Sequence, residues 1–155
     1  MKYSRLTTEQ FDSLAQEFIN FLATQSITAQ EWETIKNKQP EVVEQELDVF
    51  SDLVWEGVLS QATYLENISE KQLFLFQIAE TQMNLIVVKV AKLDVDISTQ
   101  QGYKWLQDNF ASDDVEFFTA TKEFSKDKKL DVFGLVKQGA VITKGGLYKF
   151  FAEII

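Results

Sequence analysis

Cysteine and histidine are both absent from this chain of 155 residues. Without cysteine there is no disulfide framework, no thiolate nucleophile and no cysteine zinc site. Without histidine the chain lacks the usual general base, the imidazole metal ligand and any Ser-His or Cys-His dyad. Zinc, copper and haem sites are therefore not expected, and the sequence predicts no cofactor. A hard cation such as Mg²⁺ or Ca²⁺ on carboxylates is compatible with the composition.

Arginine and proline each occur only once, as Arg5 and Pro40. Because bidentate recognition of phosphate normally uses the planar fork of arginine, a phosphoryl-transfer enzyme is disfavoured. The formal net charge is −9, from 15 basic and 24 acidic residues, and no basic cluster is present. Both features argue against a nucleic-acid partner.

The negative charge is concentrated in the N-terminal part of the chain. Residues 1–70 carry 13 acidic and four basic side chains, whereas residues 71–155 carry 11 of each. Any preference for a basic protein partner is therefore expected in the first part. The N-terminus does not resemble a signal segment, and no apolar run approaches the roughly 20 residues that span a bilayer. The sequence predicts a cytoplasmic protein without a membrane partner.

The N-terminal part has helical spacing. Thr7 and Gln10 form a capping-box pair before an apolar repeat that continues to Leu22 as one helix. Thr28 and Glu31 form a second pair of this kind, so a second helix is expected to begin there. That helix is expected to end before the single proline.

A third helix is predicted from Pro40 to about Leu59, with an apolar and an acidic side. The apolar stripe consists of Val43, Leu47, Phe50, Val54 and Val58, widened by Val42, Val49 and Leu53. The opposite side carries Glu41, Glu44, Asp48, Asp52 and Glu56. We expect the apolar arc to lie inside the molecule, in contact with more than one neighbouring element, and the acids to face water.

Beyond residue 67 the pattern changes to short β-branched and aromatic runs. Strands are predicted over 73–78, 85–90, 93–97, 115–121 and 140–143, and the first two are joined by a hairpin loop over 79–82. Helices are predicted from Ser98 to about Phe110, over 130–137 with Gly139 after its end, and following the pair Gly145-Gly146. The predicted class is α+β: one domain over 1–155, in which a helical portion, 1–66, packs with a small, mainly antiparallel sheet and C-terminal helices, 67–155.

The acidic side of the third helix is the first candidate site. Asp48, Asp52 and Glu56 are spaced four residues apart, so their carboxylates align along the helix. They form either a dock for a basic partner or a divalent-cation site, or simply a solvated helix face, which is the preferred interpretation. Trp55 lies among these acids and is either an exposed interface residue or packed under a neighbouring segment.

The second candidate site is the turn Lys144-Gly145-Gly146. Free N–H groups at a helix start, with a lysine nearby, are suited to holding an anion. The spacing does not match a phosphate-binding loop, and a turn built from favoured turn residues is the preferred interpretation. No catalytic residue and no metal ligand is assigned.

Two further patterns are interpreted structurally. Asp94 and Asp96 alternate on one face of a predicted strand. They are expected to form its solvent-exposed face rather than to act as paired acids. Ser125 and Lys128 have the spacing of a serine-lysine nucleophile, but they lie in a highly charged loop, where a neutral lysine is implausible.

Three segments carry a resemblance to a known family: residues 17–23 (EFINFLA), 48–59 (DVFSDLVWEGVL) and 138–145 (QGAVITKG). Over essentially its whole length, the chain resembles a family of small uncharacterised bacterial proteins, a domain of unknown function. The resemblance implies no activity and no functional residues. Histidyl-tRNA synthetase labels can attach to such sequences, but that enzyme class holds ATP with arginines in a much larger catalytic domain, and this chain has only Arg5.

Two functional hypotheses follow. The first is a non-enzymatic cytosolic interaction module, which pairs with itself as a homo-oligomer or binds a basic protein partner. The second is a carboxylate- and lysine-based enzyme, with Mg²⁺ as a possible cation, or a binder of a small anionic metabolite without turnover.

Overall fold

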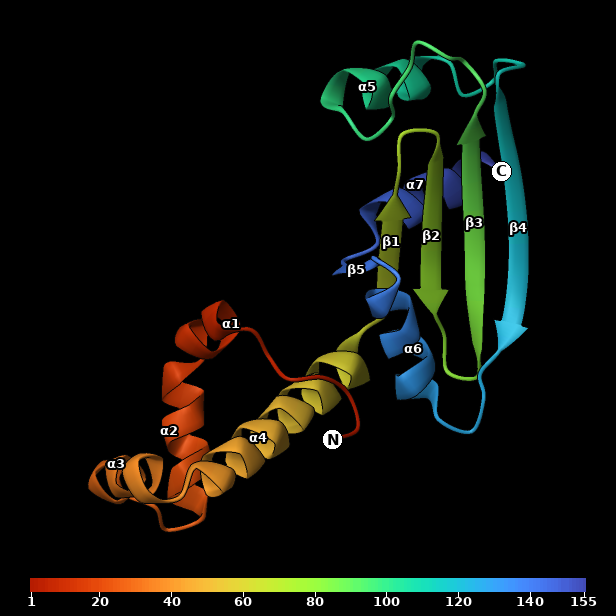
Figure 1. Cartoon of the computed structure of the whole chain (residues 1–155). Helices are drawn as coiled ribbons and strands as arrows, with labels where there is room; N and C mark the ends of the chain where they lie inside the picture. The colour runs from red at the N-terminus through yellow and green to blue at the C-terminus, as the bar shows by residue number, and fades with distance from the viewer. The chain divides into compact units, whose positions relative to one another are not determined.

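The computed structural model describes all residues from Met1 to Ile155. They form two compact units, Met1–Ser60 and Gln61–Ile155, called here the helical unit and the sheet unit. The predicted α+β class is confirmed, with seven helices and a five-stranded antiparallel sheet (Figure 1). None of the helices combines the length and the apolar character needed to cross a membrane. That residues 1–155 behave as a single domain stays a prediction.

The helical unit contains α1 (Thr8–Ser13), α2 (Ala15–Thr24), α3 (Ala29–Lys38) and α4 (Pro40–Gln61), whose last residue belongs to the sheet unit. The predicted capping box is present: the Thr7 side chain accepts from the Gln10 N–H, and the Gln10 side chain accepts from the Thr7 N–H. Thr28 caps α3 through the Glu31 N–H, as expected. The prediction of one continuous first helix is wrong, because the backbone leaves the helical conformation at Leu14.

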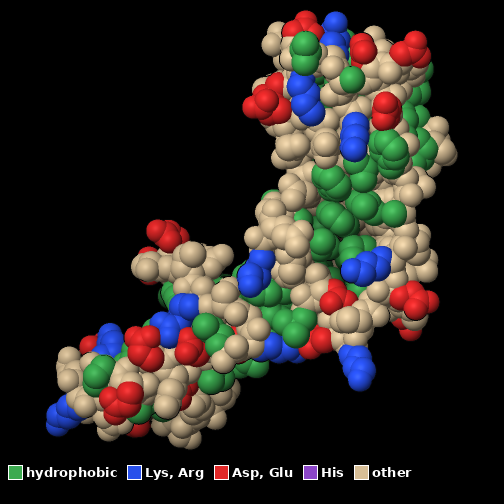
Figure 2. Space-filling view, turned by 45° about the vertical axis from the view of Figure 1, so that its right-hand side comes forward, with side chains coloured by type: hydrophobic (Ala, Val, Ile, Leu, Met, Phe, Trp, Pro, Cys, Tyr) green, Lys and Arg blue, Asp and Glu red, His purple; other side chains and the backbone are tan.

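The sheet unit has the strand order β4-β3-β2-β1-β5. Its elements are β1 (Tyr64–Ile68), β2 (Gln72–Ile78), β3 (Gln82–Val90), α5 (Gln100–Asp108), β4 (Val115–Glu123), α6 (Lys128–Lys137), β5 (Val141–Thr143) and α7 (Gly146–Ile154). Alternate side chains of β2, β3 and β4 pack against α5 and α7, with Phe151 and Leu106 completely buried. Figure 2 shows further hydrophobic side chains gathered over the surface of the sheet.

The predicted strand over 93–97 is wrong, because these residues form a loop. Val95 and Ile97 are buried, as alternation suggested, but Leu93 is 93% exposed. The ammonium group of Lys71 donates to the carbonyl oxygens of Lys92, Leu93 and Val95. Those carbonyls bind a side chain rather than a neighbouring strand, which keeps the segment out of the sheet.

Other boundaries differ in detail. The strand Tyr64–Ile68 was not predicted, so the change from helices to strands comes at Tyr64 rather than at residue 67. Thr99, not Ser98, caps α5 by accepting from the Gly102 N–H. The predicted helix over 130–137 and the edge strand before α7 are confirmed, and Gly139 has the expected positive φ, 107°.

Candidate functional site

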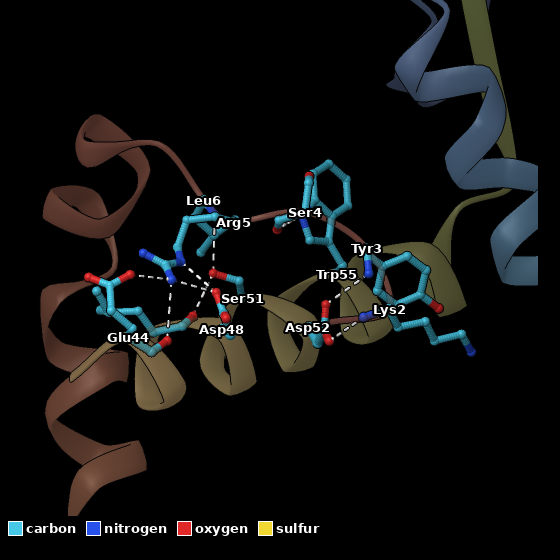
Figure 3. A network of polar contacts seen from close by, with 11 residues as sticks. Lys2, Tyr3, Ser4, Arg5, Leu6, Glu44, Asp48, Ser51, Asp52 and Trp55 are labelled. Atoms are coloured by element: carbon cyan, nitrogen blue, oxygen red, sulfur yellow. Dashed lines mark hydrogen bonds and ion pairs between the residues drawn. The ribbon is translucent and has the colours of Figure 1, made fainter. Parts of the chain in front are cut away.

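The acidic side of α4 lies against the chain's own N-terminal segment, residues 2–6 (Figure 3). Arg5 spans two of the acids: its Nε lies 2.7 Å from Oδ1 of Asp48, and its Nη2 lies 2.8 Å from Oε2 of Glu44. These hydrogen bonds, to Glu44 first and then to Asp48, raise the pKa of the Arg5 guanidinium. The single arginine of the chain therefore has a structural role, because it ties the N-terminal segment to α4.

Asp52 and Trp55 bind the backbone of the same segment. The Asp52 carboxylate accepts from the backbone N–H groups of Lys2 and Tyr3, at 2.7 and 2.9 Å. The Trp55 indole N–H donates to the carbonyl oxygen of Ser4 at 3.1 Å. Of the two interpretations of Trp55, packing under a neighbouring segment is therefore the one that its contacts match.

Glu56 ends the row of acids and binds two side chains. Its Oε1 accepts from the ammonium of Lys2 at 3.1 Å and from the hydroxyl of Tyr3 at 2.8 Å. Burial, and then the hydrogen bond to Glu56, raise the pKa of the Tyr3 hydroxyl. Tyr3 is one of the buried apolar residues of the helical unit.

Ser51 anchors the segment from beneath. Its hydroxyl accepts from the Leu6 N–H at 3.1 Å and donates to the Leu47 carbonyl at 2.7 Å. Ser51 is the one fully buried polar residue of the chain, and both of its hydrogen-bonding functions are used. Sequence patterns do not predict this role, because serine also occurs on solvated helix faces.

The expectation that the acids face water is therefore wrong for Asp48, Asp52 and Glu56, all of which are partly covered. Their basic and N–H partners come from a segment more than 40 positions earlier in the chain. Helical periodicity describes contacts within one helix and cannot predict such a distant contact. The structure contains no group of three or more Asp and Glu side chains arranged to hold a metal ion. Whether the row also receives a second protein stays a prediction.

The Lys144-Gly145-Gly146 turn is shaped by an aromatic ring. Gly145 is buried in the left-handed conformation, and a Cβ atom at this position would lie 2.4 Å from the ring of Tyr64. Its N–H donates to the Thr143 hydroxyl at 3.1 Å, while Lys144 is exposed. Packing thus accounts for the glycine, and anion binding at this turn stays a prediction.

Each of the four residues interpreted structurally has a polar partner. The Asp96 carboxylate accepts from the hydroxyl and the N–H of Ser98, which lowers the pKa of Asp96. Asp94 lies 3.5 Å from the ammonium of Lys92. The hydroxyl of Ser125 donates to Asp131 at 2.8 Å, and its N–H donates to the same carboxylate. The ammonium of Lys128 donates to the Glu80 carbonyl, so no serine-lysine pair forms.

The helical unit contains an open groove that sequence reasoning missed. Its volume is about 470 Å³, within the size range of ligand and peptide-anchor sites. Three of its lining residues are charged and exposed, Asp12, Glu33 and Lys36, and Glu33 and Lys36 form an ion pair at 2.7 Å. The other lining residues are apolar: Phe11, Ala15, Phe18, Ile19, Leu22, Ile27, Ala29, Trp32, Val43 and Leu47.

Three of the lining side chains, Phe11, Phe18 and Trp32, belong to a cluster of aromatic rings that also includes Phe21 and Phe50. The ring of Phe18 lies edge-on to Trp32 at 5.4 Å and to Phe50 at 5.0 Å between centroids. Phe11 stacks on Phe50 at 6.0 Å, and Phe21 lies 5.4 Å from the same ring. Phe50 is buried, whereas the other four rings are only partly covered. The helical unit thus exposes aromatic surface that a fully closed core would bury.

The apolar repeat that predicted the first helix lines the groove in part, through Ala15, Phe18 and Leu22 of α2. Helical spacing identifies a shared face but does not say whether another element covers it. Ile19 of α2 is 54% exposed, and on the apolar side of α4 the expectation of burial is wrong for Val49, Leu53 and Val58, which are 52%, 55% and 43% exposed.

Comparison with known proteins gives a family but no activity. A family described as a family of unknown function, DUF6495, matches residues 1–155. No curated protein matches the chain, and no solved structure matches it. The expected resemblance to a domain of unknown function over the whole chain is confirmed, and the chain belongs to this family.

Proposed function

We propose that this chain is a non-enzymatic protein-interaction module whose helical unit binds an amphipathic helix of a partner protein. The open groove lined by Phe11, Phe18 and Trp32 is the observation that carries the proposal. Helix-in-groove recognition needs an apolar trough that accepts side chains at successive turns of the ligand helix. Partly exposed aromatic rings are the kind of surface from which interface hot spots are made.

The charge of the helical unit specifies the partner further. Residues 1–60 contain 11 acidic and four basic side chains, and the charged residues that line the groove are Asp12 and the ion pair Glu33–Lys36. A ligand helix with lysines or arginines beside its apolar face is therefore favoured over an acidic one. The basic partner inferred from the sequence is thus proposed to dock at the groove.

The acidic row of α4 has a supporting role in this proposal. Residues 2–6 are tied to Asp48, Ser51 and Asp52, and Thr7, immediately after them, caps α1. Because α1 contributes Phe11 and Asp12 to the groove, the row fixes one wall of the binding site. The acids therefore position the site without contacting the partner.

Calorimetric titration with two designed helical peptides tests the proposal. Both peptides carry leucines at positions i, i+3, i+4 and i+7, and their polar faces are either lysine-rich or glutamate-rich. We expect the lysine-rich peptide to bind at least about tenfold more tightly at low salt. The substitution Ala15→Phe, which fills the groove, should abolish binding, whereas Gln16→Phe, on the next and non-lining residue, should not. Equal binding of the peptide by both variants would show that the groove is not the binding site.

The alternative is a carboxylate- and lysine-based enzyme or a binder of a small anionic metabolite. Asp48, Asp52 and Glu56 already accept hydrogen bonds from residues 2–6, so the structure favours this alternative less. A thermal-shift screen with MgCl₂ and phosphorylated metabolites separates the two. A shift that Asp52→Asn and Lys144→Ala together abolish would favour the alternative.

A further inference from the structure

The outer edge of β4 is a long, regular and open strand edge. β4 runs over nine residues and pairs only with β3, without a bulge, from Gln82 opposite Glu123 to Val90 opposite Val115. It contains no proline. Native sheets usually shorten, bend or cover such an edge, because its unpaired N–H and C=O groups attract another strand.

The backbone direction at this edge follows from two flanking hydrogen bonds. The Ala91 N–H donates to the Asp114 carbonyl, and the Phe124 N–H donates to the Thr81 carbonyl. Even-numbered positions of β4 therefore direct their backbone groups towards β3. In an antiparallel ladder the alternate, odd-numbered positions then present their N–H and C=O groups outwards. The outer edge offers a complete set of donors and acceptors centred on Thr119.

We infer that β4 pairs antiparallel with β4 of a second copy of this chain, about a two-fold axis at Thr119. In this register the two strands overlap over their whole length, with Val115 opposite Glu123 of the second copy. Glu116 then lies directly opposite Lys122 of the second copy, and symmetry repeats the pair. Neither the side chain of Glu116 nor that of Lys122 has a hydrogen-bond or ion-pair partner in its own chain, and both residues are exposed.

The charge pairing is specific to this register. If β4 of the second copy slides by two residues in either direction, Glu116 lies opposite Ala120 or Phe124 of the second copy. The ion pair is then lost. The register of greatest overlap and the register of opposite charges are thus the same. This self-complementarity is a property of β4 towards itself, which favours a second copy over an unrelated strand as the occupant.

The apolar surface of the sheet also continues across the proposed interface. Phe118 is 46% exposed, and the ammonium group of Lys89 lies over its ring, 5.0 Å from the ring centroid. In the proposed dimer Phe118 lies opposite Ala120 of the second copy. Two cross-strand rows then join those of the second copy: Phe74-Val87-Phe118 and Phe76-Leu85-Ala120. Pairing therefore extends an apolar face that is already present in one copy.

Charge exchange between the two positions tests the inference. Sedimentation velocity over a range of concentrations is expected to show a reversible dimer of the full chain. Glu116→Lys alone or Lys122→Glu alone makes both symmetry-related pairs repulsive and should raise the dissociation constant by about tenfold or more. The double variant Glu116→Lys/Lys122→Glu, and an equimolar mixture of the two single variants, should restore the wild-type value.

A monomer at every concentration would overturn the inference, as would a dimer that ignores the single substitutions or is not rescued by the mixture. The lack of native cysteine allows a test of the register. Thr119→Cys should form a disulfide-linked dimer on oxidation, because Thr119 meets its own symmetry mate, whereas Thr121→Cys should not. Crosslinking through position 121 alone would overturn the register. Neither test depends on the groove of the helical unit.

Discussion

The helical unit and the sheet unit are stabilised in different ways. Of the buried apolar side chains, 17 belong to the sheet unit and only five to the helical unit, Tyr3, Leu6, Leu22, Phe50 and Leu59. The helical unit relies instead on partly covered aromatic rings and on polar contacts between residues 2–6 and α4. A unit with few fully buried groups keeps surface available for a ligand, whereas the sheet unit has the features of a rigid scaffold.

The largest expected effect comes from two glycines, one in each unit. A Cβ on Gly102 in α5 would lie 1.7 Å from the carbonyl oxygen of Asp96, whereas a Cβ on Gly57 in α4 would meet nothing. Gly102→Ala should therefore destabilise the sheet unit by about 3 kcal/mol or more, because the backbone must move. Gly57→Ala should stabilise α4 by about 0.5–1 kcal/mol through helix propensity. Urea unfolding measures both, and equal effects would contradict the glycine geometry.

The next effect concerns the buried serine beneath residues 2–6. Ser51→Ala leaves the Leu6 N–H without its partner and should cost about 1–3 kcal/mol. The exposed Ser60, which bonds only to a carbonyl of its own helix, is the matched control, and Ser60→Ala should change stability by less than about 0.5 kcal/mol. Hydrogen exchange in α1 should rise in the first variant only. Unchanged hydrogen exchange in α1 would show that Ser51 does not help to position this wall of the groove.

A smaller effect is expected from the ion pairs of Arg5. Arg5→Lys keeps the charge but loses the fork that reaches both Glu44 and Asp48. Because these groups are about a third or more exposed, the cost should be about 0.5 kcal/mol and should shrink at high salt. Lys104→Ala, which breaks an exposed pair in α5, should have almost no effect. A salt-independent loss would show that packing rather than charge is at work.

The smallest effect depends on pH and lies in the sheet unit. Burial raises the pKa of Glu66 above its ordinary value, so the folded state favours the protonated carboxyl. The stability that Glu66 contributes is fully present below the ordinary glutamate pKa and is lost as the pH rises through the raised pKa. Glu66→Gln should therefore raise the melting temperature at neutral pH but not at about pH 4. The same gain at both pH values would contradict this assignment.

Local chemistry predicted much of the fold. The hydroxyls of Thr7 and Thr28 bind N–H groups three residues away, so the sequence alone identified both helix starts. Gly139 likewise marked the end of α6. The error at residues 93–97 has a distant cause, because Lys71 binds the carbonyls that a strand would need. Alternation still predicted that Val95 and Ile97 are buried.

The candidate site was harder to predict than the fold. The sequence identified Asp48, Asp52, Trp55 and Glu56 as a set, but not the segment that binds them, because that contact joins positions more than 40 residues apart. The groove was hidden for the opposite reason. Phe11, Phe18 and Trp32 have the spacing of ordinary core residues, and only the arrangement of the helices leaves them partly open.

Fluorine NMR of the three tryptophans, labelled as 5-fluorotryptophan, tests the central proposal most directly. Trp32 lines the groove, Trp55 bonds to Ser4, and Trp105 packs against the core of the sheet unit. On titration with the lysine-rich helical peptide, the Trp32 resonance should shift while those of Trp55 and Trp105 stay in place. A Trp32 resonance that does not move, or equal shifts of all three, would contradict the account.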